Sequence, residues 1–351
     1  MKLSLIKNII AAVAVAAASS AAIADEDTPV RLWGASSTVN AYHGFLFLGN
    51  PLGFYEKEGV KVEFGTAAGS SATLQLLATN QVQMGYVGMD ALILAKANNP
   101  DLPIKAAYLQ DRGNIYEIVV PTESDIKTVK DLEGQSIGVA NLASGAIPKL
   151  KAVLTEAGLD PNKAVGLIPV GNGAQAAAAL RTGRVQALSL FRAQHALIET
   201  LGYEFRYFSK DTPSAVIAVN TDWLADNKDQ AAAILRGVAQ SSAFAQANPK
   251  ATVEEFWELF GRSQGAEEEK ALKDAMHVLS STAKLWKDHT DDSIQWGAMD
   301  DEAWTGMQDA LIDAKLMSER VDNATLYTSE LIDMLNPVDL SHALELAASR
   351  E

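Results

Sequence analysis

Residues 77–83 read LATNQVQ and residues 180–186 read LRTGRVQ, so four of the seven positions are identical at an offset of 103 residues. Asn80 and Gly183 share one position of this repeat, and both residue types favour the left-handed turn that follows a helix. Each copy therefore predicts the end of a helix, a tight turn and the start of a strand. The same offset aligns the small-residue loops 69–71 and 172–174. We expect two similar lobes whose matched loops face each other across a cleft.

Strand-like and helix-like segments alternate around both copies of the repeat. Residues 60–64, VKVEF, show the strict alternation that is typical of a strand. Further strands are expected at residues 31–34, 82–87, 104–109, 116–120, 136–140, 165–170, 185–191 and 214–220, and helices at 45–48, 71–79, 90–98, 144–158 and 174–181. Such alternation with short links indicates a mainly parallel sheet covered by helices on both faces.

The part of the chain after Thr221 is expected to be helical. Its tryptophans are candidate core residues: Trp257, Trp286, Trp296 and Trp304. The strand pattern implies that the chain crosses between the lobes twice, near Val120 and near Val219. One lobe would then comprise residues 25–120 plus 215–351, and the other residues 121–214. A ligand is expected between the lobes, at the carboxyl ends of the strands.

The N-terminus has the composition of a secretory signal peptide. Lys2 and Lys7 precede an apolar run over residues 9–22, which is too short for a membrane span, and residues 22–24 form a small-x-small cleavage site. Cleavage after Ala24 would leave 327 residues with 27 basic and 44 acidic side chains, a net charge of −17. Such a charge repels nucleic acids and anionic membranes, so neither is expected as a partner. The absence of cysteine excludes disulfides, a lipid anchor on cysteine and thiolate catalysis.

Three segments carry a resemblance to a known family. Residues 53–62 read GFYEKEGVKV, residues 130–139 read KDLEGQSIGV and residues 179–187 read ALRTGRVQA. They resemble the patterns GFFxxEGLxV, KDLKGKxIGV and ALxxGxVDA of the solute-binding proteins of ABC importers, in the sulfonate, taurine, nitrate and thiamine-precursor (SsuA/THI5-like) group. The resemblance covers residues 30–220 and is looser beyond them. This chain departs from the family after the third pattern, because a Trp-rich segment is replaced by SLFR at residues 189–192.

The resemblance implies the type II periplasmic-binding-protein fold, an α/β Venus flytrap of two lobes with mixed β-sheets flanked by helices. It implies a periplasmic receptor that captures a small organic anion: a sulfonate, a carboxylate or a related aromatic or heterocyclic compound. A permease in the inner membrane would then take the ligand, and the receptor is expected to be a monomer without cofactor or metal. The alternatives are a ligand-sensing subunit of a membrane receptor and an enzyme similar to the thiamine-precursor synthases.

No catalytic motif in the sequence supports the enzyme alternative. The five histidines are scattered and never at metal-ligand spacing, and the sequence contains no Gly-x-Ser-x-Gly, Walker or His-Glu-x-x-His motif. The resembled synthases use a Cys-rich iron segment, which a chain without cysteine does not have. We therefore expect a binding protein without catalytic residues.

The loops expected at the cleft supply the first candidate ligand-binding residues. Ser70, Ser71, Ser144 and Asn172 stand where helices are expected to begin. Backbone N–H groups and the helix dipole favour an anion there, although the same residue types also act as ordinary helix caps. Asp90 stands at a further helix start, where its carboxylate either caps the helix or accepts a hydrogen bond from a ligand amine or N–H group.

Two arginines are candidate counter-ions for an anionic ligand. Arg192 follows the end of a strand, where cleft residues belong. Arg112 stands with Asn114 in the segment QDRGN, just before the first expected crossing. Either arginine can equally be a solvated surface side chain, which is the common state of this residue type.

Aromatic residues around the first strand-to-helix loop are candidates for stacking on a planar ligand: Trp33, Tyr42 and His43. Because the Trp-rich segment of the resembled family is missing, stacking from the other lobe would fall to Phe191. The alternative for Tyr42 is a place in the core.

Overall fold

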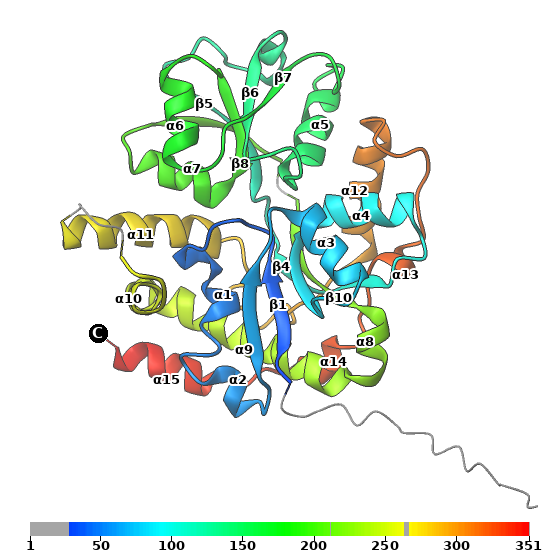
Figure 1. Ribbon diagram of the computed structural model, residues 1–351, viewed down its shortest axis with the longest axis vertical. Coiled ribbons are helices and arrows are strands. Elements are labelled where there is room, and N and C mark those ends of the chain that lie inside the picture. The colour runs from blue at the N-terminus through cyan, green and yellow to red at the C-terminus, as the bar shows by residue number, and fades with distance from the viewer. Residues whose placement is uncertain (1–27, 211, 263–266, 351) are drawn as a thin grey trace, which may run out of the picture.

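Two five-stranded mixed β-sheets lie one above the other along the long axis of the molecule, each flanked by helices (Figure 1). The computed structural model describes residues 28–210, 212–262 and 267–350, so the expected signal peptide, residues 1–24, lies outside the described residues. The first sheet has the order β2-β1-β3-β10-β4, formed by Val62–Thr66, Val30–Gly34, Met84–Gly88, Ala215–Asn220 and Ile104–Asp111. The second has the order β7-β6-β8-β5-β9, formed by Gly166–Pro169, Ser136–Val139, Ala187–Phe191, Tyr116–Pro121 and Phe205–Phe208.

The two sheets share one topology. In the first, β2, β1 and β3 are parallel while β10 is antiparallel to β3 and β4; in the second, β7, β6 and β8 are parallel while β5 is antiparallel to β8 and β9. The antiparallel strands are those that enter from the other lobe. Each starts at the carboxyl edge of the parallel strands, since Tyr116 pairs with Phe191 and Ala215 pairs with Gly88. The expectation of a mainly parallel sheet therefore fails at these two strands, whereas the mixed sheets implied by the resemblance are confirmed.

Helices flank both sheets, and those that follow β10 pack on the first. The first lobe contains η1 (Ala41–His43), α1 (Gly44–Phe47), α2 (Phe54–Lys57), α3 (Ser70–Ala78) and α4 (Met89–Asn98). The second contains η2 (Val129–Leu132), α5 (Ala146–Glu156), α6 (Ala174–Arg181) and α7 (Arg192–Glu199). The expected C-terminal helices are α8 (Thr221–Asp226), α9 (Lys228–Ala247), α10 (Pro249–Phe260), α11 (Glu268–Ala283), α12 (Asp301–Asp313), α13 (Asn323–Leu326), α14 (Ile332–Leu335) and α15 (Ser341–Ser349). None of the helices in the described part of the chain is long and apolar enough to span a membrane.

The sequence repeat forms the same helix end and left-handed turn in both lobes. Asn80 and Gly183 have φ angles of 53° and 68°. The two glutamines that follow the turns make equivalent hydrogen bonds. Gln83 Nε2 donates to Asn80 O at 3.1 Å, and its Oε1 accepts from Arg31 N at 3.1 Å. Gln186 Nε2 donates to Gly183 O at 2.9 Å, and its Oε1 accepts from Ser136 N at 3.1 Å. Each glutamine thus joins the turn to the neighbouring strand.

The chain crosses between the sheets earlier than predicted. β4 ends at Asp111 in the first sheet and β5 begins at Tyr116 in the second, so residues 116–120 do not belong to the first lobe. The return segment lies beside this crossing: Asn114 Nδ2 donates to Ser209 Oγ at 3.1 Å, and Ser214 Oγ donates to Gly113 O at 2.6 Å. The prediction missed α7 and β9, the latter a half-buried edge strand.

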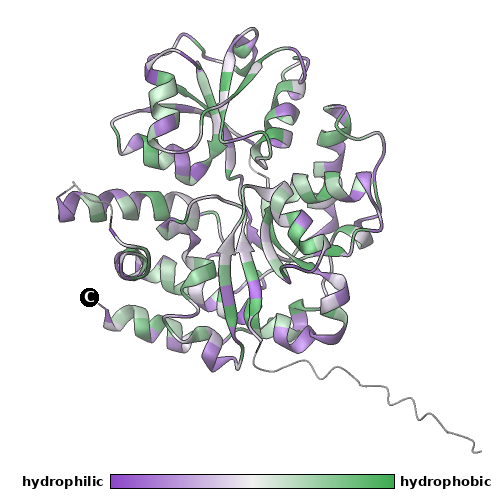
Figure 2. Ribbon diagram, viewed as in Figure 1, coloured by the Kyte–Doolittle hydropathy of each residue, from purple (hydrophilic) through white to green (hydrophobic). Residues whose placement is uncertain are grey.

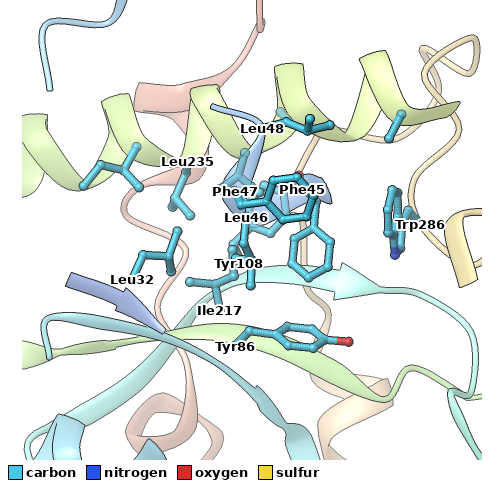
Figure 3. Close-up of a cluster of buried hydrophobic side chains, with 14 of the residues drawn as sticks. Leu32, Phe45, Leu46, Phe47, Leu48, Tyr86, Tyr108, Ile217, Leu235 and Trp286 are labelled. Carbon is cyan, nitrogen blue, oxygen red and sulfur yellow. The ribbon is translucent and has the colours of Figure 1, made fainter. Parts of the chain in front are cut away.

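One hydrophobic cluster of the first lobe lies between its sheet and α9, and a second includes residues of α3, α4 and α12. Figure 2 shows hydrophobic segments on the strands of both sheets and on the helices around them. Leu32, Tyr86 and Ile217 point from the sheet towards Phe45 and Leu235 in the close-up of this core (Figure 3). Three of the four C-terminal tryptophans are buried as expected, and Trp257 is partly buried: Trp286, Trp296 and Trp304.

Candidate functional site

A small cavity lies between the two sheets, where the carboxyl ends of β1, β3, β6 and β8 meet the crossing segment. Its volume is about 50 Å³. This leaves room for only a few water molecules, well below the ~300 Å³ at the lower end of ligand pockets. The lobes are therefore close together in this arrangement. The lining residues are Ala35, Ser36, Ser37, Tyr42, His43, Gly69, Tyr86, Val87, Ile115, Tyr116, Ala140, Asn141, Ser144, Gly145, Asn172 and Phe191.

Direct contacts close the cavity between the lobes. The rings of Tyr42 and Phe191 meet edge to face with their centroids 5.1 Å apart. Gly69, with a φ of +116°, lies against the backbone of Ala143, and a Cβ at Gly69 would stand 2.8 Å from the Ala143 carbonyl oxygen. The two matched loops share the cavity, since Gly69 lines it from one lobe and Asn172 from the other.

The structure brings five of the predicted ligand-binding residues to the cavity: Tyr42, His43, Ser144, Asn172 and Phe191. Ser144 stands just before Gly145, the N-cap of α5, and its Oγ accepts the N–H of Ala146 at 3.2 Å. Oδ1 of Asn172 is buried and has no hydrogen-bond partner among the described residues. Asn172 therefore brings an unpaired polar atom to the cavity.

Ser70 and Ser71 begin α3, as predicted, but neither lines the cavity. Ser70 is buried, and its Oγ accepts the N–H of Gly88 at 3.0 Å, which ties α3 to the end of β3. Ser71 is exposed and lines a separate groove beside α4 and α5. The loop that precedes α3 contributes Gly69 to the cavity instead.

Asp90 lies in the first turn of α4, is buried and does not line the cavity. Burial raises the pKa of its carboxyl group, while the ammonium group of Lys149 acts in the opposite direction. Lys149 belongs to α5 of the other lobe and donates to Thr212 Oγ1 at 2.6 Å. Asp90 therefore lies within the electrostatic influence of a cationic side chain of the other lobe.

Neither candidate counter-ion reaches the cavity. Arg112 Nη1 donates to Ala298 O at 3.0 Å and so ties the end of β4 to the C-terminal part of the chain. Arg192, at the start of α7, forms an ion pair with the buried Glu117 of β5. Its guanidinium also lies 5.2 Å from the centre of the Tyr207 ring. Both arginines are thus engaged in contacts within the protein.

Asn114 and Trp33 also lie outside the cavity. Asn114 is buried in the first crossing segment, where it bonds Ser209 and accepts the N–H of Tyr116 at 2.9 Å. Trp33 lies over Gly65 of the neighbouring strand, where an added Cβ would stand 2.4 Å from the indole ring. Both side chains therefore support the surrounding structure.

Two tyrosines that line the cavity and the carboxylate beside them were not among the predicted site residues. Tyr86 and Tyr116 line the cavity. The Tyr86 hydroxyl donates to Oδ2 of Asp111, which is fully buried at the end of β4. Burial raises the pKa of Asp111 to about 7, although the hydrogen bond from Tyr86 lowers it. The sequence did contain one indication of these two residues, which is their position: Tyr86 stands near the end of an expected strand, and Tyr116 stands at the start of one.

The cavity is lined by neutral groups. Among the described residues, no aspartate, glutamate, lysine or arginine lines it. Nδ1 of His43 accepts the N–H of Asn40 at 3.2 Å, which leaves the proton of the neutral ring on Nε2. Burial lowers the pKa of His43 to about 3, so the ring is neutral at ordinary pH. The site therefore offers aromatic faces together with uncharged donors and acceptors.

The buried His43 predicts a loss of stability in acid. Its pKa is about 3 in the folded chain against 6.5 without burial, so below this upper value the unfolded state binds a proton that the folded state does not. The free energy of unfolding should fall as the pH drops from about 6.5 towards 3. We expect His43→Asn to lose less stability over this range, as measured by urea unfolding at several pH values.

Comparison with the wild type isolates the contribution of His43, because both proteins keep Asp111. The raised pKa of Asp111 has the opposite effect: it lowers stability as the pH rises from about 4 to 7. Parallel pH profiles for the two proteins would contradict the assignment to His43.

A larger open groove, of about 1260 Å³, lies at the opposite end of the first sheet. Its walls come from residues 28–31, 58–61 and 223–236. No residue predicted to bind a ligand lines it. Its surface includes exposed charged side chains such as Arg31, so it lacks the enclosed apolar character of a small-molecule site.

A model of the family described as NMT1/THI5 like matches residues 40–252. The formylaminopyrimidine-binding protein of Halalkalibacterium halodurans is 24% identical over 172 residues, which are 48% of this chain and 50% of that protein. The chain thus matches about half the length of this curated relative.

Solved structures share the fold at low sequence identity. The alkanesulfonate-binding protein SsuA from Xanthomonas axonopodis pv. citri, bound to MOPS, has a TM-score of 0.63 and 15% identity, over 85% of this chain and 98% of that chain. The desulfurization enzyme DSZB has a TM-score of 0.55 and 14% identity, over 87% of this chain and 98% of that chain. The chain therefore has the periplasmic-binding-protein fold, which also occurs in an enzyme.

Proposed function

Because the chain belongs to the NMT1/THI5-like family, we propose that it is the periplasmic solute-binding receptor of an ABC importer. The observation that carries the proposal is the position of the cavity, which lies between two sheets of equal topology and is lined from both. A ligand held there contacts both lobes at once, so its binding favours the closed arrangement over an open one. A permease that recognises the closed form would then receive the ligand.

The lobes are proposed to move as two bodies about the paired crossing segments. From the strand pairing, one comprises residues 28–112 plus 214–350 and the other residues 113–213. The cavity volume of about 50 Å³ requires the lobes to separate before a ligand can enter. The signal peptide cleaved after Ala24 and a monomeric state belong to the same proposal.

The ligand is proposed to be a small aromatic heterocycle without a negative charge. Four aromatic side chains and His43 line the cavity, and no cationic side chain among the described residues does. The formylaminopyrimidine-binding relative binds a ligand of this class, as its name states. A sulfonate or carboxylate, the first expectation, would have to be held by neutral donors and the N-terminus of α5, without a counter-ion.

A ligand screen tests this proposal on the purified chain without its signal peptide. The panel contains aminopyrimidines, pyridones, aromatic carboxylates, taurine and alkyl sulfonates, and the readout is the unfolding temperature. A ligand at 100 times its dissociation constant adds about 2.7 kcal/mol to the free energy of unfolding, a shift that is easily measured. We expect a heterocycle to bind and to be recovered unchanged by mass spectrometry.

Each alternative has its own expected outcome, either in this screen or in a binding assay with the membrane partner. Conversion of a bound compound would establish the enzyme. This outcome is tested because DSZB, which has the same fold, is an enzyme. A bound compound that is unchanged, in a protein that docks on a sensor kinase and on no permease, would establish the sensing subunit. Binding of sulfonates alone would overturn the proposed ligand class and leave the receptor function in place.

A further inference from the structure

The two lobes contact each other through different helices on opposite sides of the molecule. On one side α7 of the second lobe packs on α11 of the first, and on the other side α5 of the second lobe packs on α4 and α12 of the first. Figure 1 shows α7 and α11 on the left of the view and α5, α4 and α12 on the right. The two contacts differ in their apolar packing, in their polar bonds and in their connection to the crossing segment.

The contact between α7 and α11 is apolar in its middle part. Ala193 and Ala196 of α7 are buried, and they belong to the same hydrophobic cluster as Val278 and Leu279 of α11. The core of the first lobe therefore extends into a helix of the second lobe. Separating the two helices would return these side chains to water, which is unfavourable in proportion to the apolar area exposed.

A polar bridge lies at the far end of the same contact. Glu199, in the last turn of α7, accepts the hydroxyl of Tyr207 through Oε1 at 2.6 Å, and its Oε2 lies 2.8 Å from Nε2 of His277 in α11. Tyr207 belongs to β9 of the second lobe, so its hydrogen bond holds the carboxylate in place for the first lobe. Because this ion pair lies at the surface, it contributes little energy, but it forms only when the two helices are together.

The near ends of both helices are bonded to the crossing segment. The N–H of Arg192, the first residue of α7, donates to the carbonyl of Ile115 at 2.7 Å. The N–H of Arg112 donates at 2.8 Å to the carbonyl of Leu285, which follows the end of α11. The contact between α7 and α11 thus begins where the chain passes between the lobes and extends outward from there.

The contact on the side of α5 is looser. Ala146, at the start of α5, joins the cluster of the first lobe, but Leu150 and Leu154 pack in the core of the second. A groove of about 300 Å³ remains between Pro148 of α5 and the helices α3 and α4. Asp90, at the start of α4, is buried, and its Oδ2 has no hydrogen-bond partner among the described residues. Separation on this side lets water reach an unpaired carboxylate oxygen, which favours it.

We infer that the lobes rotate about the contact between α7 and α11, which stays closed, and that the cavity opens on the side of α5. A hinge moves least where two bodies stay packed beside the chain that joins them. The close approach of Gly69 to Ala143 lies on the opening side, because Ala143 stands just before α5. This axis rests on the proposed receptor function and specifies how that receptor opens.

Distances between two spin labels test this axis without any ligand. The chain contains no cysteine, so labels attach only where a cysteine is introduced. Arg181→Cys in α6, which packs on α7, with Ser280→Cys in α11 gives a label pair on the side of α7. Glu156→Cys in α5 with Asp313→Cys in α12 gives a label pair on the side of α5. All four positions are exposed, and each pair is measured by pulsed electron paramagnetic resonance.

Gly69→Val is the variant that forces the lobes apart, since an added Cβ would stand 2.8 Å from the carbonyl oxygen of Ala143. We expect it to lengthen the distance of the α5 pair and to leave that of the α7 pair unchanged. The control is Gly158→Val, where an added Cβ meets nothing within 4 Å and neither distance should change. Without either substitution, the α5 pair should have the broader distribution of distances, a measurement that does not depend on the folding of Gly69→Val.

Lengthening of both pairs, or of the α7 pair alone, would overturn the proposed axis and leave the receptor function standing. A broader distribution for the α7 pair in the chain without either substitution would do the same. If neither pair lengthens in folded Gly69→Val and both distributions are narrow, the lobes do not separate. That result would reject the axis together with the proposed movement of the receptor.

The pair of Glu199 and His277 gives a second measurement of the same contact. Glu199→Gln, His277→Gln and the double variant form a double-mutant cycle on the unfolding equilibrium, measured at pH 6, on the acid side of the ordinary histidine titration. We expect a coupling of about 2- to 5-fold in the equilibrium constant, the range of a surface ion pair, with or without Gly69→Val. A coupling that disappears in the Gly69→Val background would mean that α7 leaves α11 on opening, and the axis would be wrong.

Discussion

Replacing Gly69 by valine should weaken ligand binding by ~100-fold or more, equivalent to about 2.7 kcal/mol. The closed arrangement leaves no room for a side chain here, because a Cβ would stand 2.8 Å from the carbonyl oxygen of Ala143 in the other lobe. The backbone also adopts a φ of +116°, a conformation that residues other than glycine rarely take. The variant should fold with its lobes held apart, and calorimetric titration with the identified ligand measures the loss.

Gly158→Val separates backbone strain from the clash between the lobes. Gly158 has a φ of +81°, and an added Cβ there would meet nothing within 4 Å. Both variants should lose stability through strain, by about 1–2 kcal/mol. Only Gly69→Val should lose affinity as well. If the two variants bound the ligand equally, the contact at Ala143 would have no part in closure.

Arg192→Ala is expected to lower the free energy of unfolding by about 3–5 kcal/mol. The variant leaves Glu117, whose side chain is 0% exposed, without its cationic partner. His195 does not replace the arginine: its Nδ1 lies 3.9 Å from Glu117, but burial lowers the pKa of the imidazole. Urea unfolding at neutral pH measures the change, with ligand affinity followed in parallel.

The affinity of the folded Arg192→Ala variant distinguishes its structural role from a role in binding. Arg192 does not line the cavity, so the affinity should stay within a few-fold of the wild type. Arg320→Ala is the control, since this arginine pairs with Asp309 at the surface, where an ion pair contributes about 1 kcal/mol or less. If the Arg192→Ala variant kept its stability but lost its affinity for the ligand, Arg192 would be a ligand-binding residue and the prediction would be wrong.

The position of the cavity was predictable because it depends on the chain's local pattern. Strand ends and the loops that follow them can be read from alternation and turn residues, and three residues chosen in this way line the cavity: Tyr42, Ser144 and Phe191. The polarity of the cavity was not predictable. Whether Arg192 meets a ligand or Glu117 depends on which strand lies beside it, and that pairing joins residues 75 positions apart.

The neighbours of Tyr86 could not be predicted from the sequence either. Its place near the end of a strand was predicted, yet a tyrosine in a strand is equally at home in a core. Its hydrogen bond to Asp111 forms only because β4 and β3 lie on either side of β10, which brings Asp111 within reach of the Tyr86 hydroxyl. The sequence predicts the position of each residue along a strand, but it does not predict which side chains become neighbours.

The sequence by itself determined the two-fold repeat of helix, left-handed turn and strand, because Asn80, Gly183 and the two glutamines act on neighbours only a few residues away. Only the tertiary structure decided where the chain crosses and which groups line the cavity. The crossing depends on strand pairing between distant segments, and β5 joins the second sheet because it starts at the edge where β8 ends. The lining depends on how the two lobes meet: Arg192 pairs with Glu117 outside the cavity, and neutral groups line it.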